Sequence, residues 1–280
     1  MPTRLRELLS GTRQRLLWLE YDEYARQVFA NGASDWLTQS GRFSTTMIQA
    51  RKALKTEVVS LDIAAPGMAA VTRAAEPLAT CLNALADPIA RRFVGDCIDA
   101  LAHQLGSQVD LVLRVPSPLD LLRQVGGGAE ASFDELDEVG AALVASVRQF
   151  AEKPISGLLL TRSVDTAMTR DEQDAYSPLL QAAKHYSWVT CLQCTESVVS
   201  AAAAQWSEVD LVLCAALSRA QVTDLNTRGL KFGGGLAQNI WSDRGHSLEK
   251  IEATLLFGTV PSDANPETVL ARCSSLAVAE

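Results

Sequence analysis

The sequence predicts an α/β fold, a (β/α)8 barrel of the TIM type with an N-terminal helical extension. Short apolar runs alternate with helix-like stretches, as parallel strands joined by helical crossovers require. The runs are apolar throughout, which indicates a sheet that is covered on both faces. The 280 residues are also close to the size of such a barrel, about 250 residues. A doubly wound sheet fits less well, because no strand is followed by a GxGxxG or phosphate-loop pattern.

The composition limits the classes of function. The chain is 48% hydrophobic and carries a formal net charge of −8. No apolar run reaches the length of about 18 residues that a membrane span needs, and the N-terminus lacks the pattern of a secretory signal. Nucleic acid is disfavoured as a partner because no cluster of Lys and Arg is seen. We therefore expect a cytoplasmic protein with reduced cysteines, which acts on a small molecule or binds another protein.

The chain is expected to be one domain over residues 1–280, with a helical segment at 1–55 and the barrel core at 56–280. One helix is predicted to end at Asn31-Gly32, a stop of the left-handed type. A second helix is predicted to start at Ser44. The run RLLWLEY at 15–21 fits either a helix or a weak strand, and its propensities leave both open.

Seven strands are predicted in the barrel core. The first begins at residue 57 and is closed by Pro66-Gly67, and Gly233–Gly235 is interpreted as a tight turn after the sixth. The residues between the first two strands favour helix and are interrupted by Pro77 and Pro88, which predicts two or three helices there. The remaining strands are expected at 110–118, 155–163, 188–194, 210–217, around 230, and 253–261, before a closing helix with Pro266 in its first turn.

Active sites of such barrels lie at the carboxyl ends of the strands, so the polar residues there are the candidates. Two arginines among them, Arg114 and Arg162, could form a cationic floor for a carboxylate or phosphate. They could equally pair with Asp62, Asp165 or Glu196. The full set is Asp62, Arg114, Ser117, Arg162, Ser163, Gln193, Cys194, Glu196, Ser218, Arg219, Gly234, Gln238, Thr259 and Asp263.

Asp62 is the best candidate for an acid or base, since a carboxylate after a strand of Val and Leu would be partly desolvated. It could also be a turn or N-cap residue before Pro66. The three histidines lie in predicted helices and not at strand ends, so a histidine base or a His-rich metal site is not expected. Cys191 and Cys194 form a CxxC, but the first lies within a strand, where a thiolate would not be stabilised.

Four segments resemble the uroporphyrinogen decarboxylase superfamily, which includes corrinoid-dependent methyltransferases and cobalamin-independent methionine synthase. SLDIAAPGMA at 60–69 is similar to a strand with a substrate-binding aspartate, which maps onto Asp62. WLTQSGRF at 36–43 resembles a loop with a substrate-binding arginine, which maps onto Arg42, although the gap to Asp62 is shorter than in the family. LKFGGGLAQ and TLLFGTVPSDANPETV resemble the family's GNLDP turn and its last strand.

The departures from the family concern the metal. The resemblance implies zinc held by His-x-Cys on one strand and by a cysteine on the last strand. Cys194 matches, but Leu192 stands at the histidine position and Thr259 at the second cysteine. Cys273 lies well into the closing helix and cannot readily substitute. We therefore expect no bound zinc and no other cofactor, and the incomplete arginine-rich loop disfavours porphyrinogen decarboxylation.

The sequence thus favours a barrel that acts on a small anionic organic molecule, by group transfer such as methyl transfer or by a lyase reaction such as decarboxylation. The alternative is a catalytically silent barrel that serves as a ligand-binding or partner subunit. A homodimer remains open. So does the possibility that this chain is the partner of a corrinoid protein and transfers methyl groups with Cys194 alone. The expected catalytic residues are Asp62 and Cys194, and the expected substrate-binding residues are Arg42, Arg114, Arg162, Gln193, Gly234, Gln238 and Thr259.

Overall fold

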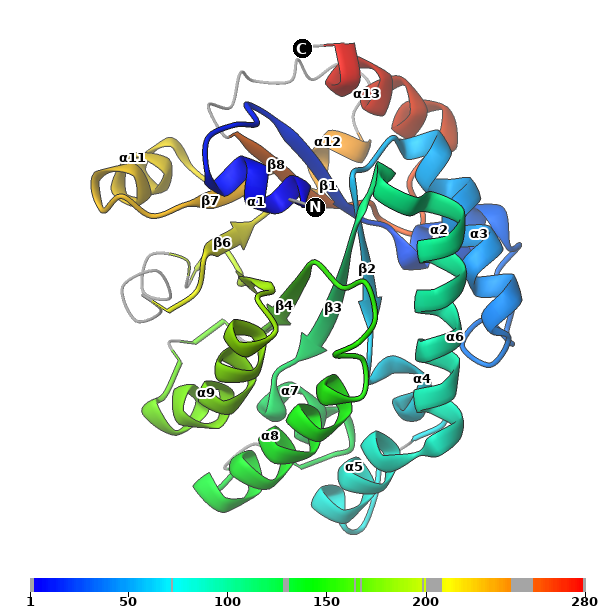
Figure 1. Cartoon of the computed structure of the whole chain (residues 1–280), viewed down its shortest axis with the longest axis vertical. Coiled ribbons are helices and arrows are strands. Elements are labelled where there is room, and N and C mark those ends of the chain that lie inside the picture. The colour runs from blue at the N-terminus through cyan, green and yellow to red at the C-terminus, as the bar shows by residue number, and fades with distance from the viewer. Residues whose placement is uncertain are drawn as a thin grey trace.

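A computed structural model of the chain describes residues 3–71, 73–127, 131–163, 165–166, 168–197, 199, 208–242 and 254–278. Eight parallel strands form one sheet in the order β1-β8-β7-β6-β5-β4-β3-β2 (Figure 1). This arrangement confirms the predicted (β/α)8 barrel. The strands are β1 (Leu16–Glu20), β2 (Val58–Asp62), β3 (Asp110–Pro116), β4 (Gly157–Thr161), β5 (Val189–Gln193), β6 (Leu211–Cys214), β7 (Phe232–Leu236) and β8 (Leu255–Thr259).

The barrel closes between β1 and β2 through the turn that precedes β2. The amide of Glu57 donates to the carbonyl of Leu17 at 2.8 Å, and the amide of Leu19 donates to Oγ1 of Thr56 at 3.1 Å. Thr56 is fully buried at this seam. Its hydroxyl therefore replaces part of the ladder that would otherwise join the first and last strands of the sheet order.

The run at 15–21, which the sequence predicted as either helix or strand, contains strand β1. This strand pairs in parallel with β8, with Leu16 opposite Leu255 and Glu20 opposite Thr259. The barrel therefore has eight strands, one more than the seven predicted, and its first strand lies within the segment expected to be a helical extension. A five-residue apolar run has no local signal that separates the two states, so the pairing with β8 decides.

Helices follow the strands and cover the outside of the barrel (Figure 1). The stop at Asn31-Gly32 is confirmed, since both residues have positive φ just after α2, and α3 begins at Ser40, four residues before the predicted start. The helices are α1 (Arg4–Leu9), α2 (Asp22–Phe29), α3 (Ser40–Leu54), α4 (Ala65–Met68), α5 (Pro77–Ala86), α6 (Pro88–Leu105), α7 (Pro118–Gln124), α8 (Phe133–Arg148), α9 (Arg170–His185), α11 (Arg219–Thr227), α12 (Asn239–Ser242) and α13 (Pro266–Val278).

Two apolar layers lie on either side of the sheet. Alternate strand residues such as Trp18, Val112 and Phe257 fill the barrel interior, and the others pack against the helices. Leu5 and Leu8 of α1 join the interior layer, and α1 lies across the amino-terminal ends of the strands (Figure 1). Helix α1 therefore plugs one end of the barrel and leaves the other end for a site.

The expected turn at Gly233–Gly235 is wrong, because these glycines are buried residues of β7. A Cβ on Gly233 would lie 2.6 Å from Leu255 Cδ2, and one on Gly234 would lie 2.3 Å from the Cys214 carbonyl oxygen. Glycine is therefore required by the close approach of β7 to its neighbours rather than by a reversal of the chain.

None of the helices in the described ranges combines the length and the apolar character that crossing a bilayer demands.

Candidate active site at the barrel mouth

The open end of the barrel is lined by the last inward-facing residue of several strands. Alternate residues of each strand point into the barrel, so the apolar interior layer with Trp18, Val58 and Val112 is followed by polar side chains at this end. The register places Asp62 beside Arg114 and Glu20 beside Thr259, and it pairs Thr161 with Gln193. The mouth layer is therefore formed by Glu20, Asp62, Arg114, Thr161, Gln193 and Thr259.

Arg114 is the centre of the charged part of this layer. Its Nη1 donates to Glu20 Oε2 at 2.6 Å, its Nη2 to Asp22 Oδ2 at 2.5 Å, and its Nε to Asp62 Oδ2 at 3.3 Å. The side chains of Arg114, Asp62 and Asp22 are 16%, 17% and 27% exposed, whereas that of Glu20 is only 4% exposed. One guanidinium is thus held by three carboxylates, from the ends of β1 and β2 and from the start of α2.

Glu20 is fixed by neutral partners as well. Its Oε1 accepts a hydrogen bond from Trp18 Nε1 at 2.8 Å and another from the Ser60 hydroxyl. Trp18 in turn packs edge to face on Phe257, with ring centroids 5.8 Å apart. The buried carboxylate therefore has partners on both oxygens and is positioned by the interior layer below it.

Asp62 is held by the backbone that follows its strand. Its Oδ1 accepts from the amides of Ala64 and Ala65, each at 2.9 Å, at the start of α4. Asp62 thus has the turn role that the sequence offered as one alternative, and its acid–base role stays a prediction. Its Oδ2 faces Arg114 at the mouth.

The charges of this cluster shift two pKa values. Burial opposes ionisation of Arg114, but the adjacent Asp22, Glu20 and Asp62 raise the pKa of its guanidinium well above the usual value. Burial also works to raise the pKa of Asp22, yet the charge and hydrogen bond of Arg114 outweigh it and the pKa is lowered. Three carboxylates against one guanidinium leave a formal charge of −2 at the mouth.

The expected cationic floor is not formed. Arg162 does not join Arg114, because its Nε donates to Glu172 Oε1 of α9 at 3.2 Å and its Nη1 to the Thr166 carbonyl at 2.6 Å. Both arginines pair with carboxylates, as the alternative interpretation held, although the partners are mostly other residues than those it named. The physical reason is that two strand-end arginines buried in one barrel each acquire a local acidic partner.

Cys194 is a poor thiolate in this structure. It is buried just after β5, with Sγ 3.9 Å from the Leu213 carbonyl oxygen. Burial and the neighbouring Cys214 raise the pKa of its thiol to about 12, so the group is protonated at neutral pH. Cys191 lies in the interior layer, and burial raises the pKa of its thiol well above the usual value. The CxxC therefore behaves as two small apolar residues.

The residues at the family's zinc positions do not fit a zinc ion. Leu192 packs in the outer apolar layer rather than at the mouth. Cys194 is a buried thiol, and Thr259 at the end of β8 offers a single hydroxyl. Among the described residues, no group of three His, Cys, Asp or Glu side chains is arranged to hold a metal.

The other predicted residues are dispersed. Arg42 is an exposed residue of α3 that pairs with Asp35. Ser117 and Ser218 cap α7 and α11, and Ser163 donates to Asp120. Glu196 accepts a hydrogen bond from Gln221 through its carbonyl group. The side chain of Arg219 lies outside the described residues.

Two residues of the cluster were missed by sequence reasoning. Glu20 ends β1 and Asp22 begins α2, and both lie in the segment that was expected to be an extension. The signal was present, because LLWLE is an apolar run that ends on an acid, like VVSLD at 58–62. The strand-end rule does not select Glu20, because the propensities of RLLWLEY do not establish a strand there.

A cavity of about 520 Å³ adjoins the mouth at the loops after β7 and β8. Gln238, Trp241, Pro261 and Asp263 are among its lining residues. It lies next to the acidic cluster along the chain, since the Val260 amide donates to the Glu20 carbonyl at 2.9 Å. The cavity thus lies beside the acidic cluster, but none of the four cluster residues is part of its lining.

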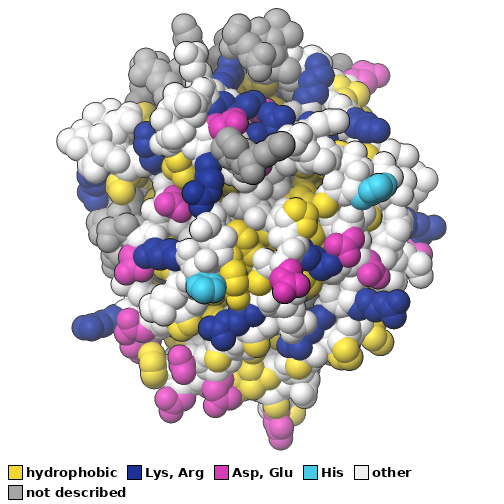
Figure 2. All heavy atoms as spheres, viewed as in Figure 1, with side chains coloured by type: hydrophobic (Ala, Val, Ile, Leu, Met, Phe, Trp, Pro, Cys, Tyr) yellow, Lys and Arg dark blue, Asp and Glu magenta, His cyan; other side chains and the backbone are white. Residues whose placement is uncertain are grey.

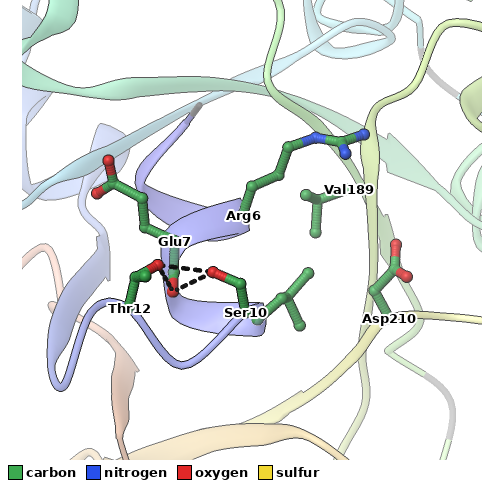
Figure 3. Close-up of a pocket in the computed structure, with 7 residues that line it drawn as sticks. Arg6, Glu7, Ser10, Thr12, Val189 and Asp210 are labelled. Atoms are coloured by element: carbon green, nitrogen blue, oxygen red, sulfur yellow. Dashed lines mark hydrogen bonds between the residues drawn. The ribbon is translucent and has the colours of Figure 1, made fainter. Parts of the chain in front are cut away.

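A second cavity, of about 870 Å³, lies at the opposite end of the barrel between α1 and the starts of β5 and β6. Figure 3 shows Arg6 reaching from α1 toward Val189, with Asp210 on the far side. Asp210 already accepts from the amide and hydroxyl of Thr190, at 2.8 and 2.9 Å. This space borders the plugged end and is separate from the strand-end residues.

Comparison with known proteins extends the fold assignment. No protein-family profile and no curated protein match the chain. Among solved structures, a methyltransferase from Methanosarcina mazei aligns over 99% of each chain with a TM-score of 0.69 and 14% identity. The homocysteine methyltransferase MmuM from Escherichia coli, in its metallated form, aligns over 97% of this chain and 99% of its own, with a TM-score of 0.50 and 14% identity. At this identity the likeness is one of fold: the chain shares the barrel of these methyltransferases.

Proposed function

We propose that this protein is a barrel enzyme that transfers a methyl group, with its reaction at the mouth formed by Glu20, Asp22, Asp62 and Arg114. The observation that carries the proposal is the acidic cluster itself, which brings three carboxylates together around one guanidinium at the strand ends. Barrel enzymes carry their chemistry at this end. The two methyltransferases with the same fold favour methyl transfer over decarboxylation.

The charge of the cluster favours a substrate with a positive reacting group. A formal charge of −2 in a partly buried site attracts a cation and repels a carboxylate or phosphate. A methyl group bonded to a sulfonium or a quaternary nitrogen is electrophilic and leaves behind a neutral heteroatom. We therefore replace the anionic substrate expected from the sequence with a small cationic methyl donor.

The proposed step balances without a metal. A thiol acceptor attacks the methyl carbon, the new carbon–sulfur bond forms as the bond to the sulfonium breaks, and neutral sulfide leaves with the bonding pair. The thiol proton passes to a carboxylate, for which Asp62 is the candidate because it is partly exposed at the mouth and is positioned by two backbone amides. Arg114, which is itself held by the buried Glu20, donates to this carboxylate.

The test is transfer of a deuterated methyl group from trimethylsulfonium to homocysteine, measured by mass spectrometry, with binding of the sulfonium measured by calorimetry. Wild-type protein is expected to bind trimethylsulfonium in preference to methylsulfonate. Asp62→Asn is expected to weaken cation binding and to lower transfer by roughly 10²-fold or more. Asp35→Asn, which removes an exposed carboxylate of the pair with Arg42, is the matched control and should leave both unchanged.

Two outcomes would contradict this proposal. Preferential binding of methylsulfonate that is lost in Arg114→Ala would restore the anionic substrate. Unchanged transfer in correctly folded Asp62→Asn, judged by its circular dichroism and melting temperature, would remove Asp62 from the reaction.

One observation favours the second candidate, a silent ligand-binding barrel. The charged groups of the cluster already satisfy one another, since each hydrogen bond of Arg114 described above ends on a carboxylate. Saturable binding of a cation with no transfer to any thiol tested would support this second role.

A further inference from the structure

A basic cavity lies at the amino-terminal end of the barrel, away from the mouth. It has a volume of about 370 Å³ and is bounded by α3, the starts of β1 and β2, β8 and α13. Its lining contains four cations and one carboxylate, a formal charge of +3. The lining residues are Arg4, Arg15, Leu17, Arg51, Lys55, Glu57, Gln108, Leu256 and Leu276.

The single carboxylate is already shared. Glu57 Oε1 accepts from Arg4 Nη1 at 2.8 Å and also from Arg13, and its Oε2 accepts from the Leu17 amide at 3.1 Å. Among the described residues, Arg51 donates to two carbonyl groups, those of Thr56 at 3.0 Å and Gln108 at 3.1 Å. Within the described part of the chain, no carboxylate lies at salt-bridge distance from Arg51 or Lys55. Arg51 and Lys55 therefore bring positive charge to this cavity without a carboxylate partner among the described residues.

Two further observations show that this charge is under-satisfied. Nε of Arg4 is buried and has no hydrogen-bond partner among the described residues. Burial lowers the pKa of Arg51, and the nearby Arg4 adds to this effect, whereas Tyr21 and Glu57 oppose it without cancelling it. An anion in the cavity would relieve both conditions, since it would supply an acceptor and a compensating charge.

The floor of the cavity is apolar. Leu17, Leu256 and Leu276 are buried with at most 8% of each side chain exposed. The charged groups and the leucines line one cavity, so a ligand could contact both at once. A ligand that bears a charged head and a short hydrocarbon part would match this lining better than an inorganic ion.

We infer that this cavity, defined by Arg4, Arg51 and Lys55 above a floor of three leucines, is a binding site for a small amphipathic anion with a phosphate or carboxylate head. The site is separate from the mouth and independent of the proposed methyl transfer. Figure 2 shows dark-blue Lys and Arg side chains gathered around an acidic one in the upper part of the face that carries α1. Sequence patterns did not predict this cluster, because residues 4, 15, 51 and 55 come from separate segments of the chain.

The test is calorimetric titration of the full-length protein at low ionic strength with hexyl phosphate, inorganic phosphate and hexanol. Hexyl phosphate is expected to bind one site with an affinity at least about tenfold higher than inorganic phosphate, because only it can use the leucine floor. Hexanol is expected to show no saturable binding. Equal binding of the two phosphates, or no binding of hexyl phosphate, would overturn the inference.

Lys55 is the most suitable residue to substitute. Among the described contacts its side chain makes no hydrogen bond, so its replacement should not disturb the fold. Lys55 has a left-handed backbone, with φ of 59°, and Lys55→Gln keeps a similar side chain there, so the backbone strain is unchanged. The variant is expected to weaken hexyl phosphate binding roughly fivefold to tenfold, and Lys55→Arg to restore it. Arg92→Gln removes a charge from an 85% exposed side chain of α6 and should have no effect. Equal losses in the Gln variants of Lys55 and Arg92 would reduce the effect to general ionic attraction and contradict the site.

Discussion

At the scale of residues, the mouth is governed by one arginine and the carboxylates around it. Arg114 has a raised pKa and Asp22 a lowered one, because each charge stabilises the other against the effect of burial. Ionised partners are then required for stability as well as for the proposed chemistry. The pH dependence of unfolding therefore reports on this cluster directly.

We predict that Asp22→Asn lowers the free energy of unfolding at pH 7 by about 1–2 kcal/mol. The folded pKa of Asp22 lies below its unfolded value, about 3.9. Its contribution is therefore present above that value and is lost as the pH falls through the folded pKa. The difference between wild type and variant should be constant from pH 7 to about pH 5 and shrink below about pH 4, as measured by urea unfolding.

Asp35→Asn is the control for this prediction. Asp35 pairs with Arg42 at the surface, where both side chains are more than 40% exposed, so its effect should stay within about 0.5 kcal/mol. A difference between wild type and Asp22→Asn that grows toward low pH would contradict a lowered pKa.

Sequence reasoning at this scale found half of the cluster. Asp62 and Arg114 lie toward the carboxyl ends of strands with strong apolar runs, and the strand-end rule selects them. Glu20 and Asp22 follow a strand that local propensity could not establish. Charge compensation among the four then depends on distances across three strands, which no pattern along the chain contains.

At the scale of elements, β7 shows how backbone packing fixes a sequence. Three consecutive glycines normally disfavour a strand, yet here they let β6, β7 and β8 approach closely. The hydrogen-bond ladder, which is shared with neighbours far away in sequence, overrides the local preference for a turn.

We predict that Gly234→Ala destabilises the protein by about 2 kcal/mol or more. The new Cβ would lie 2.3 Å from the Cys214 carbonyl oxygen and 2.6 Å from Leu217 Cδ1. The carbonyl belongs to the backbone of β6 and cannot move without disturbing its pairing with β7. Chemical denaturation measures the change. Gly41→Ala in α3, where a Cβ meets nothing within 4 Å, should be neutral or slightly stabilising, and a comparable loss in both variants would refute the packing argument.

At the scale of the whole molecule, α1 separates the two ends of the barrel. Its Leu5 is fully buried in the interior layer. The amides of Arg4 and Leu5 donate to Asp110 at 3.2 and 2.7 Å, which anchors the helix to the start of β3. The plug leaves the mouth as the open end of the interior and places the basic cavity beside the closed end.

We predict that Leu5→Ala lowers the free energy of unfolding by about 2–5 kcal/mol, because it opens a cavity where α1 meets the interior layer. Ile89→Ala, at a side chain that is 77% exposed on α6, should change it by less than about 0.5 kcal/mol. Thermal and urea unfolding of both variants measure the difference. A cost for Leu5→Ala as small as that of Ile89→Ala would mean that α1 does not contribute to the core.

The sequence by itself determined the fold class, most strand positions, the acid Asp62 and the arginine Arg114, because apolar runs and strand ends are local signals. Only the tertiary structure decided that β1 completes the barrel, that the β7 glycines are paired, and that the charge at the mouth is negative. It also decided that scattered basic residues meet in one cavity. Pairing, close approach and electrostatic compensation depend on distances between segments far apart along the chain, and a linear pattern does not encode those distances.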